Sequence, residues 1–164
     1  MIAARAATAR IRRARTDDAP ALTAIAHAAK RHWGYPDELM SLWTADLTVS
    51  AELAAAGVVF CAEEHRRVRA FYTLSRQDDV FELEHLFVEP SAMGRGLGAM
   101  LFEHAVATVR SLNGTLLRIA SDPHAEGFYR RMGAQRVGEV ASTPRGRMLP
   151  LLFFEIAQPD DSVA

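Results

Sequence analysis

Hydrophobic residues recur along this chain with two periods, one typical of helices and one typical of strands. Where apolar residues are three and four positions apart we predict helices, and where they alternate or run together over short stretches we predict strands. The predicted helices are residues 16–32, 37–47, 50–56, the segment from the glycine-rich loop to about residue 110, and residues 123–132. The predicted strands are residues 10–14, 58–64, 68–75, 80–88, 114–121, 135–140 and 147–156.

The order of these elements predicts the fold class. Three consecutive strands between residues 58 and 88 favour an antiparallel meander, whereas the strand–helix–strand unit that follows requires one parallel pair. We therefore predict an α+β (mixed α/β) fold, with a mixed, mostly antiparallel sheet of six to seven strands flanked by about four helices. No repeat or linker divides the chain, so residues 10–157 are predicted to be one domain, with a disordered start (1–9) and a polar tail (158–164).

Composition and charge argue against several classes of function. The 164 residues carry a formal net charge of −1, which gives no reason to expect nucleic acid or an anionic membrane as a partner. No run of 18 apolar residues is present, so no membrane span is predicted. The six histidines show no paired metal spacing, and we expect no metal. The single cysteine, Cys61, favours a reducing, cytoplasmic location.

A glycine-rich loop between a predicted strand and a predicted helix carries the strongest chemical signal. Gly94, Gly96 and Gly98 stand at every second position. Free N–H groups at a helix start form an anion site, and glycines let a phosphate come close to the backbone. A plain strand–helix connection is the alternative. No Gly-Lys-Ser/Thr is present for a Walker loop, and too few β–α units follow for a Rossmann fold, although residues 94–99 satisfy its G-x-G-x-x-G/A fingerprint.

Two segments together resemble a known family. Residues 86–102, "LFVEPSAMGRGLGAMLF", resemble motif A of the GNAT superfamily of acetyl-CoA-dependent N-acetyltransferases, and residues 122–134, "DPHAEGFYRRMGA", resemble its motif B. The predicted element order between residues 10 and 156 is also similar to that of the family. Two positions depart from the motifs: Met93 stands where Gln or Arg is usual, and Asp122 where Asn is usual.

The resemblance implies that the two parallel strands splay apart and that the pantetheine arm of CoA lies between them. The backbone of the strand end, where the arm pairs, would polarise the thioester carbonyl. Amides of the glycine loop would bind the pyrophosphate, and Arg95 would add charge. Arg130 and Arg131 would meet the nucleotide phosphates, with a solvated helix face as the alternative. The expected CoA-binding residues are Leu86, Phe87, Val88, Met93, Gly94, Arg95, Gly96, Leu97, Gly98, Ala99, Asp122, Ala125, Phe128, Tyr129 and Arg131.

Acetyl transfer to an amine needs a base for the amine proton and an acid for the leaving thiolate. The resemblance implies Tyr129 as the acid and a carboxylate on the strand 80–88 as a base acting through water. Glu82 and Glu84 are the candidates, because strict alternation places both on the same side of the strand as Val88. An exposed strand face and a core tyrosine are the alternatives for these residues.

The acceptor pocket in the family comes largely from the first helices and the last strands. His32, Trp33, Tyr35 and Trp43 fall in those regions, either as the lining of a small-amine pocket or as core residues. Arg147 is a candidate for binding a substrate carboxylate. We therefore expect an N-acetyltransferase acting on a primary amine of a small molecule. The alternatives are a CoA-binding module without transferase activity, a protein or peptide N-terminal acetyltransferase, and a nucleotide-binding redox protein. The apolar strand 147–156 allows a homodimer.

Overall fold

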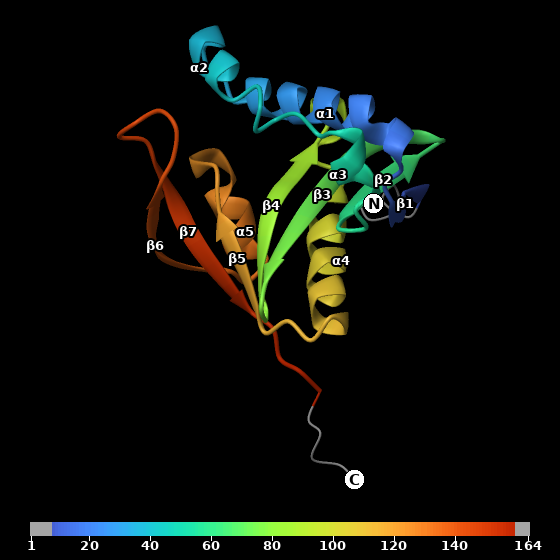
Figure 1. The fold of residues 1–164 in the computed structure, drawn as a ribbon, viewed down its shortest axis with the longest axis vertical. Coiled ribbons are helices and arrows are strands. Elements are labelled where there is room, and N and C mark those ends of the chain that lie inside the picture. Colours follow the sequence, from blue (N-terminus) through green and yellow to red (C-terminus); the bar gives the residue numbers. More distant parts are fainter. Residues whose placement is uncertain (1–7, 160–164) are drawn as a thin grey trace.

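The computed structural model describes residues 8–159. They form one mixed sheet in the order β1-β2-β3-β4-β5-β7-β6, with helices on both faces (Figure 1). The strands are β1 (Arg10–Arg13), β2 (Val59–Glu64), β3 (Arg67–Gln77), β4 (Val80–Val88), β5 (Leu116–Ala120), β6 (Gln135–Ala141) and β7 (Met148–Glu155). The helices are α1 (Ala19–His32), α2 (Asp37–Leu42), α3 (Ala51–Ala55), α4 (Leu97–Ser111) and α5 (Glu126–Arg131). The predicted fold class is confirmed.

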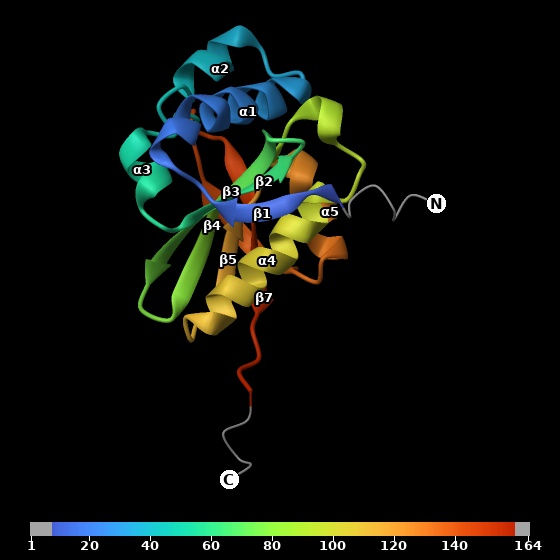
Figure 2. The ribbon, with the colours of Figure 1, turned by 90° about the vertical axis from the view of Figure 1, so that its right-hand side faces the viewer.

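Strand alternation divides the core into two layers. Phe60 and Tyr72 point to the face covered by α4 and α5, whereas Cys61 and Phe71 point to the face covered by α1, α2 and α3. Figure 2 shows α4 lying across its face of the sheet. Because both faces are covered, β2 and β3 read as nearly continuous apolar runs in the sequence.

The sheet splits at its one parallel pair. β4 and β5 pair only through Val80–Glu82 and Leu116–Arg118. Beyond these residues the two strands diverge toward α1 (Figure 1). The splayed parallel pair expected from the resemblance is therefore present, and residues 83–88 have β3 on one edge and no strand on the other.

One predicted element is shorter in the structure. The helix expected over 37–47 ends at Leu42, and successive turns carry the chain to Leu47. The side chain of Thr48 hydrogen-bonds to the carbonyl of Thr44 at 2.7 Å, a local bond that competes with helical hydrogen bonding. Trp43 and Leu47 are nevertheless buried. The spacing of apolar residues therefore indicated correctly which side chains are buried, but it did not show that the segment is helical.

The two predicted terminal segments lie partly outside the described residues. Residues 1–7 of the predicted disordered start and residues 160–164 of the predicted tail lie outside the described residues. Within residues 8–159, no helix is both long enough and apolar enough to cross a bilayer.

Candidate functional site

A cavity of about 610 Å³ occupies the gap between β4 and β5. Residues 83–88 of β4 line one side, and residues 120–122 at the end of β5 line the other. The cavity continues to both faces of the sheet. It reaches the loop before α4 and α5 on one face, and it reaches α1 and the α2–α3 connection on the other. A molecule can therefore approach the gap from either face.

A β-bulge interrupts β4 where the strands separate. Thr73 of β3 pairs with His85, and the next residue, Leu74, pairs with Leu83, so Glu84 is the extra residue. Before the bulge Leu83 packs toward α4, and after it Leu86 and Val88 do. The strict alternation assumed from the sequence is therefore wrong across residue 84, and Glu82 and Val88 lie on opposite faces.

The two candidate base residues occupy different places. Glu82 is paired with Arg118 at 2.8 Å and borders a second hollow rather than the cavity. Glu84 borders both, and one of its carboxylate oxygens accepts a hydrogen bond from the Ser75 hydroxyl at 2.6 Å. Of the two, only Glu84 is placed to exchange a proton with a group in the cavity.

His85 also lines the cavity, but both of its ring nitrogens are engaged. Nε2 lies 3.0 Å from the carbonyl of Asp46, to which it must donate, and Nδ1 lies 2.8 Å from the Thr73 hydroxyl. Burial lowers the pKa of His85, although the Asp46 carbonyl opposes the shift. The ring is therefore a neutral structural link between β4 and the α2–α3 connection.

The glycine-rich loop presents unbonded backbone N–H groups to the cavity. Gly94 and Gly96 have φ of 76° and 85°, the left-handed region that favours glycine. Gly96 is the N-cap residue of α4, and its carbonyl accepts the first helical hydrogen bond, from the Met100 N–H. None of the N–H groups of residues 94–99 donates to a backbone carbonyl of the described chain. These groups and the helix dipole fit an anion such as a pyrophosphate.

The arginines expected near this loop differ in whether they form an ion pair with a carboxylate. Arg95 points away, pairs with the buried Glu64 at 2.9 Å, and does not line the cavity. The role expected for its charge is therefore not supported. Arg130 pairs with Glu126 at 2.8 Å. Arg131 lines the cavity, and among the described residues no ion-pair partner approaches its guanidinium.

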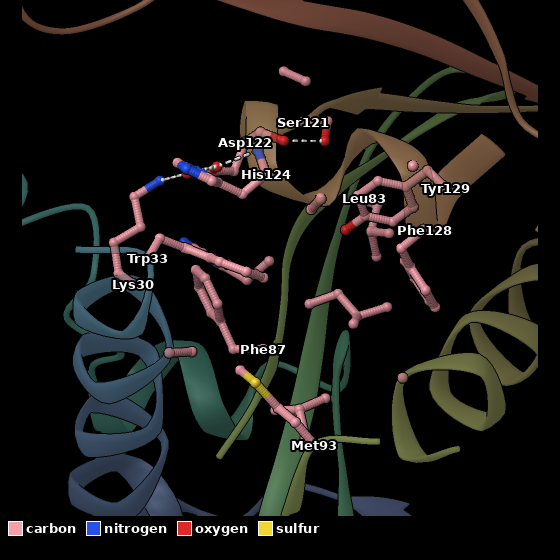
Figure 3. A pocket seen from close by; sticks show the side chains of 18 of the residues that line it. Lys30, Trp33, Leu83, Phe87, Met93, Ser121, Asp122, His124, Phe128 and Tyr129 are labelled. Carbon is pink, nitrogen blue, oxygen red and sulfur yellow. Dashed lines mark hydrogen bonds and ion pairs between the residues drawn. The ribbon is translucent and has the colours of Figure 1, made fainter. Parts of the chain in front are cut away.

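Tyr129 lines the cavity from α5, where it packs against Phe128 and Phe102. Its hydroxyl points into the cavity (Figure 3). Burial, with a smaller contribution from the negative charge of Asp122, raises the pKa of this phenol. Tyr129 is therefore protonated at neutral pH and able to donate a proton. Ala125 and Met93 also line the cavity.

A polar cluster, formed by Lys30, Tyr35, Asp122, His124 and Arg147, stands at the end of β5. Lys30 Nζ lies 2.5 Å from Asp122 Oδ2, and the Tyr35 hydroxyl donates to the same oxygen at 2.9 Å. The other carboxylate oxygen accepts from the His124 backbone N–H at 2.8 Å. Figure 3 shows the Lys30–Asp122 pair on the opposite side of the cavity from Tyr129.

Asp122 remains ionised in this cluster. Burial alone raises its pKa, but the hydrogen bond and charge of Lys30, with the His124 N–H, outweigh burial and lower the pKa below its ordinary value. Asp122 thus binds protein groups, and as an ionised carboxylate it cannot donate a hydrogen bond to a ligand. The contact to the pantetheine arm that the family's Asn implies is not available from this side chain.

The other predicted acceptor residues are only partly brought together. Trp33 lines the cavity and stacks on His124 with ring centroids 5.2 Å apart, whereas His32 contacts Trp33 from outside the cavity lining. Tyr35 contributes through the polar cluster. Sequence reasoning did not select Lys30 or His124. A signal for Lys30 was present, because it is the only lysine in an arginine-rich chain.

The split sheet, the unbonded amides of the glycine-rich loop and the buried Tyr129 beside the gap together define an acyltransferase fold that accommodates a thioester carrier. A solved structure shares this fold. The paia N-acetyltransferase from Thermoplasma acidophilum, solved in complex with coenzyme A, is 14% identical and superimposes with a TM-score of 0.73. The match covers 90% of this chain and 98% of that chain.

A sequence model of the acetyltransferase (GNAT) family matches residues 11–134, and the chain belongs to this family. Two curated relatives match parts of it. The peptidyl-lysine N-acetyltransferase YjaB of Salmonella typhimurium (strain LT2) is 33% identical over 70 residues, which cover 43% of this chain and 47% of that protein. The 5-NmdU N-acetyltransferase of Pseudomonas phage PaMx11 is 34% identical over 85 residues, covering 51% and 61%. The chain thus spans about half of these relatives' lengths.

Proposed function

We propose that this protein transfers the acetyl group of acetyl-CoA to a primary amine of a small molecule. The observation that carries the proposal is the gap between β4 and β5, with unbonded loop amides toward one face and the polar cluster toward the other. The pantetheine arm would complete the free edge of β4, as a strand does. The pyrophosphate would lie on the N–H groups of residues 94–99.

In the proposed reaction the neutral amine attacks the thioester carbonyl carbon. The C–N bond forms and the C–S bond breaks, a backbone N–H of β4 polarises the carbonyl oxygen, and Tyr129 supplies the proton that the thiolate takes up. The amine proton leaves through water to Glu84, because this carboxylate borders both the cavity and the outer hollow. Because the reacting groups lie inside a cavity of about 610 Å³, we propose a small molecule rather than a folded protein as acceptor.

The proposal is tested in two steps. Calorimetry with acetyl-CoA measures binding, and release of free thiol in a broad panel of amines measures transfer. Binding together with amine-dependent thiol release is the expected result. Binding without transfer to any amine would favour a CoA-binding module, and transfer only to peptides would favour the peptide alternative. Absence of binding would remove the proposal altogether.

Arg131 and Arg130 offer a matched test of the CoA orientation. Arg131→Gln should weaken acetyl-CoA binding about tenfold, because an unpaired guanidinium facing the cavity would lose a charge-assisted contact to a CoA phosphate. Arg130→Gln removes an arginine already paired with Glu126 and should leave the dissociation constant unchanged. Calorimetry on both variants distinguishes them, and equal affinities would contradict the role assigned to Arg131.

A further inference from the structure

Arg147 is a largely buried cation that shares one carboxylate, Asp122, with Lys30. Its side chain is 16% exposed and stacks on Trp43, with the guanidinium carbon 4.5 Å from the ring centroid. Its hydrogen-bond partners are neutral hydroxyls, Tyr35 at 3.2 Å and Ser142 at 3.4 Å. Asp122 Oδ2 lies 3.6 Å away, beyond hydrogen-bond distance. A desolvated guanidinium in this state favours an anionic partner.

Asp122 lies at ion-pair distance from Arg147 but does not hydrogen-bond to its guanidinium, because the acceptor positions of the carboxylate are already filled. They receive Lys30 Nζ, the Tyr35 hydroxyl, the His124 backbone N–H and, at 3.0 Å, His124 Nδ1. A carboxylate has about four such positions. The cluster therefore holds two cations and one carboxylate. Burial lowers the pKa of Lys30, its bond to Asp122 opposes the shift, and the charge of Arg147 adds a smaller lowering.

The opposite side of the acceptor cavity carries negative charge. Glu84 projects from the β4 bulge, and Asp46 lies on the α2–α3 connection that is bonded to β4 through His85. Arg147 enters from the loop between β6 and β7, across the gap from β4 in the strand order. The cavity thus has an acidic side next to β4 and a basic side next to β7.

We infer that the acceptor is an amine that also carries a carboxylate, as an amino acid does, with the carboxylate held by Arg147. This inference rests on the proposed acetyl transfer and names its substrate class. The planar guanidinium fork matches a carboxylate in a bidentate arrangement, and the ring of Trp43 behind it fixes its orientation. The acceptor amine then faces β4, where Glu84 and Asp46 attract it as an ammonium before it loses its proton.

The test compares acceptors that differ only in this charge. Thiol release is measured for the common L-amino acids, for their primary amides and for the corresponding decarboxylated amines, with each rate expressed per neutral amine. At least one amino acid should exceed its amide in kcat/KM by about tenfold or more. Arg147→Gln should abolish this preference mainly through KM, while acetyl-CoA affinity stays unchanged.

Arg145→Gln is the matched control, because Arg145 is an exposed arginine in the same loop that does not line the cavity. It should retain the preference. Binding can be followed without turnover, since both tryptophans of the chain, Trp33 and Trp43, line the cavity. Titration of the favoured amino acid into the CoA complex should change tryptophan fluorescence in the wild type and in the Arg145→Gln variant. The same titration should show about tenfold weaker binding of the amino acid to the Arg147→Gln variant.

The outcomes separate this inference from the proposed function. If uncharged amines are acetylated as well as amino acids, or if Arg147→Gln keeps the preference, the carboxylate site is wrong and acetyl transfer stands. If acetyl-CoA binds but no amine of any kind is acetylated, the proposed transfer fails, and this inference fails with it.

Discussion

Replacing Tyr129 by phenylalanine should lower kcat for acetyl transfer about a hundredfold, the lower end of what a positioned general acid contributes. The hydroxyl points into the cavity between β4 and β5, and the raised pKa of the phenol keeps it protonated. Phenylalanine keeps the ring packing against Phe128 and Phe102. The dissociation constant for acetyl-CoA should therefore change little. Steady-state kinetics and calorimetry measure the two effects separately.

Tyr72 provides the control for this substitution. It is a buried tyrosine whose hydroxyl lies 2.7 Å from His104 Nδ1, and it does not line the cavity. Tyr72→Phe should lower the free energy of unfolding by about 1 kcal/mol, the usual value of one hydrogen bond, and leave kcat unchanged. If Tyr129→Phe kept kcat within about twofold of the wild type, a difference worth under 1 kcal/mol of activation free energy, the acid role would be wrong.

Replacing Asp122 by alanine should lower the free energy of unfolding by about 3–5 kcal/mol. The substitution leaves Lys30 and Arg147 close together without their shared carboxylate, and the side chains of Lys30 and Asp122 are each only 12% exposed. Denaturant unfolding measures the change. Asp46→Ala is the control, because Asp46 is exposed on the same cavity and its backbone contact to His85 survives. It should change stability by no more than about 0.5 kcal/mol.

The contribution of Asp122 should also depend on pH. Its pKa is lower in the folded protein than in the unfolded chain. Its stabilising effect is therefore complete above the unfolded value of about 3.9 and is lost as the pH falls through the folded value. The stability difference between the wild type and Asp122→Asn should shrink below about pH 4. A difference that stayed constant from pH 7 to pH 3 would show that the charge of Asp122 is not what stabilises the cluster.

Much of the fold could be predicted because its signals are local. The strand Val80–Val88 was predicted with the bounds it has, and the glycines marked the start of α4 correctly. The bulge at Glu84 could not be predicted in this way. A bulge is a property of pairing between two strands, and alternation read along one strand assumes regular pairing throughout. The faces assigned to Glu82 and Glu84 failed for that reason.

Local pattern alone determined that this chain folds as a mixed sheet flanked by helices, and that a glycine-rich turn precedes a helix. These features depend on residue periodicity and backbone freedom, which neighbouring residues carry. Only the tertiary structure decided which charges are satisfied. Lys30, Asp122 and Arg147 are far apart in sequence, and whether each has a partner depends on distances that the packed sheet sets. Whether Arg95 or Arg131 has an ion-pair partner depends on the packed structure in the same way, and the sequence could not distinguish these two arginines.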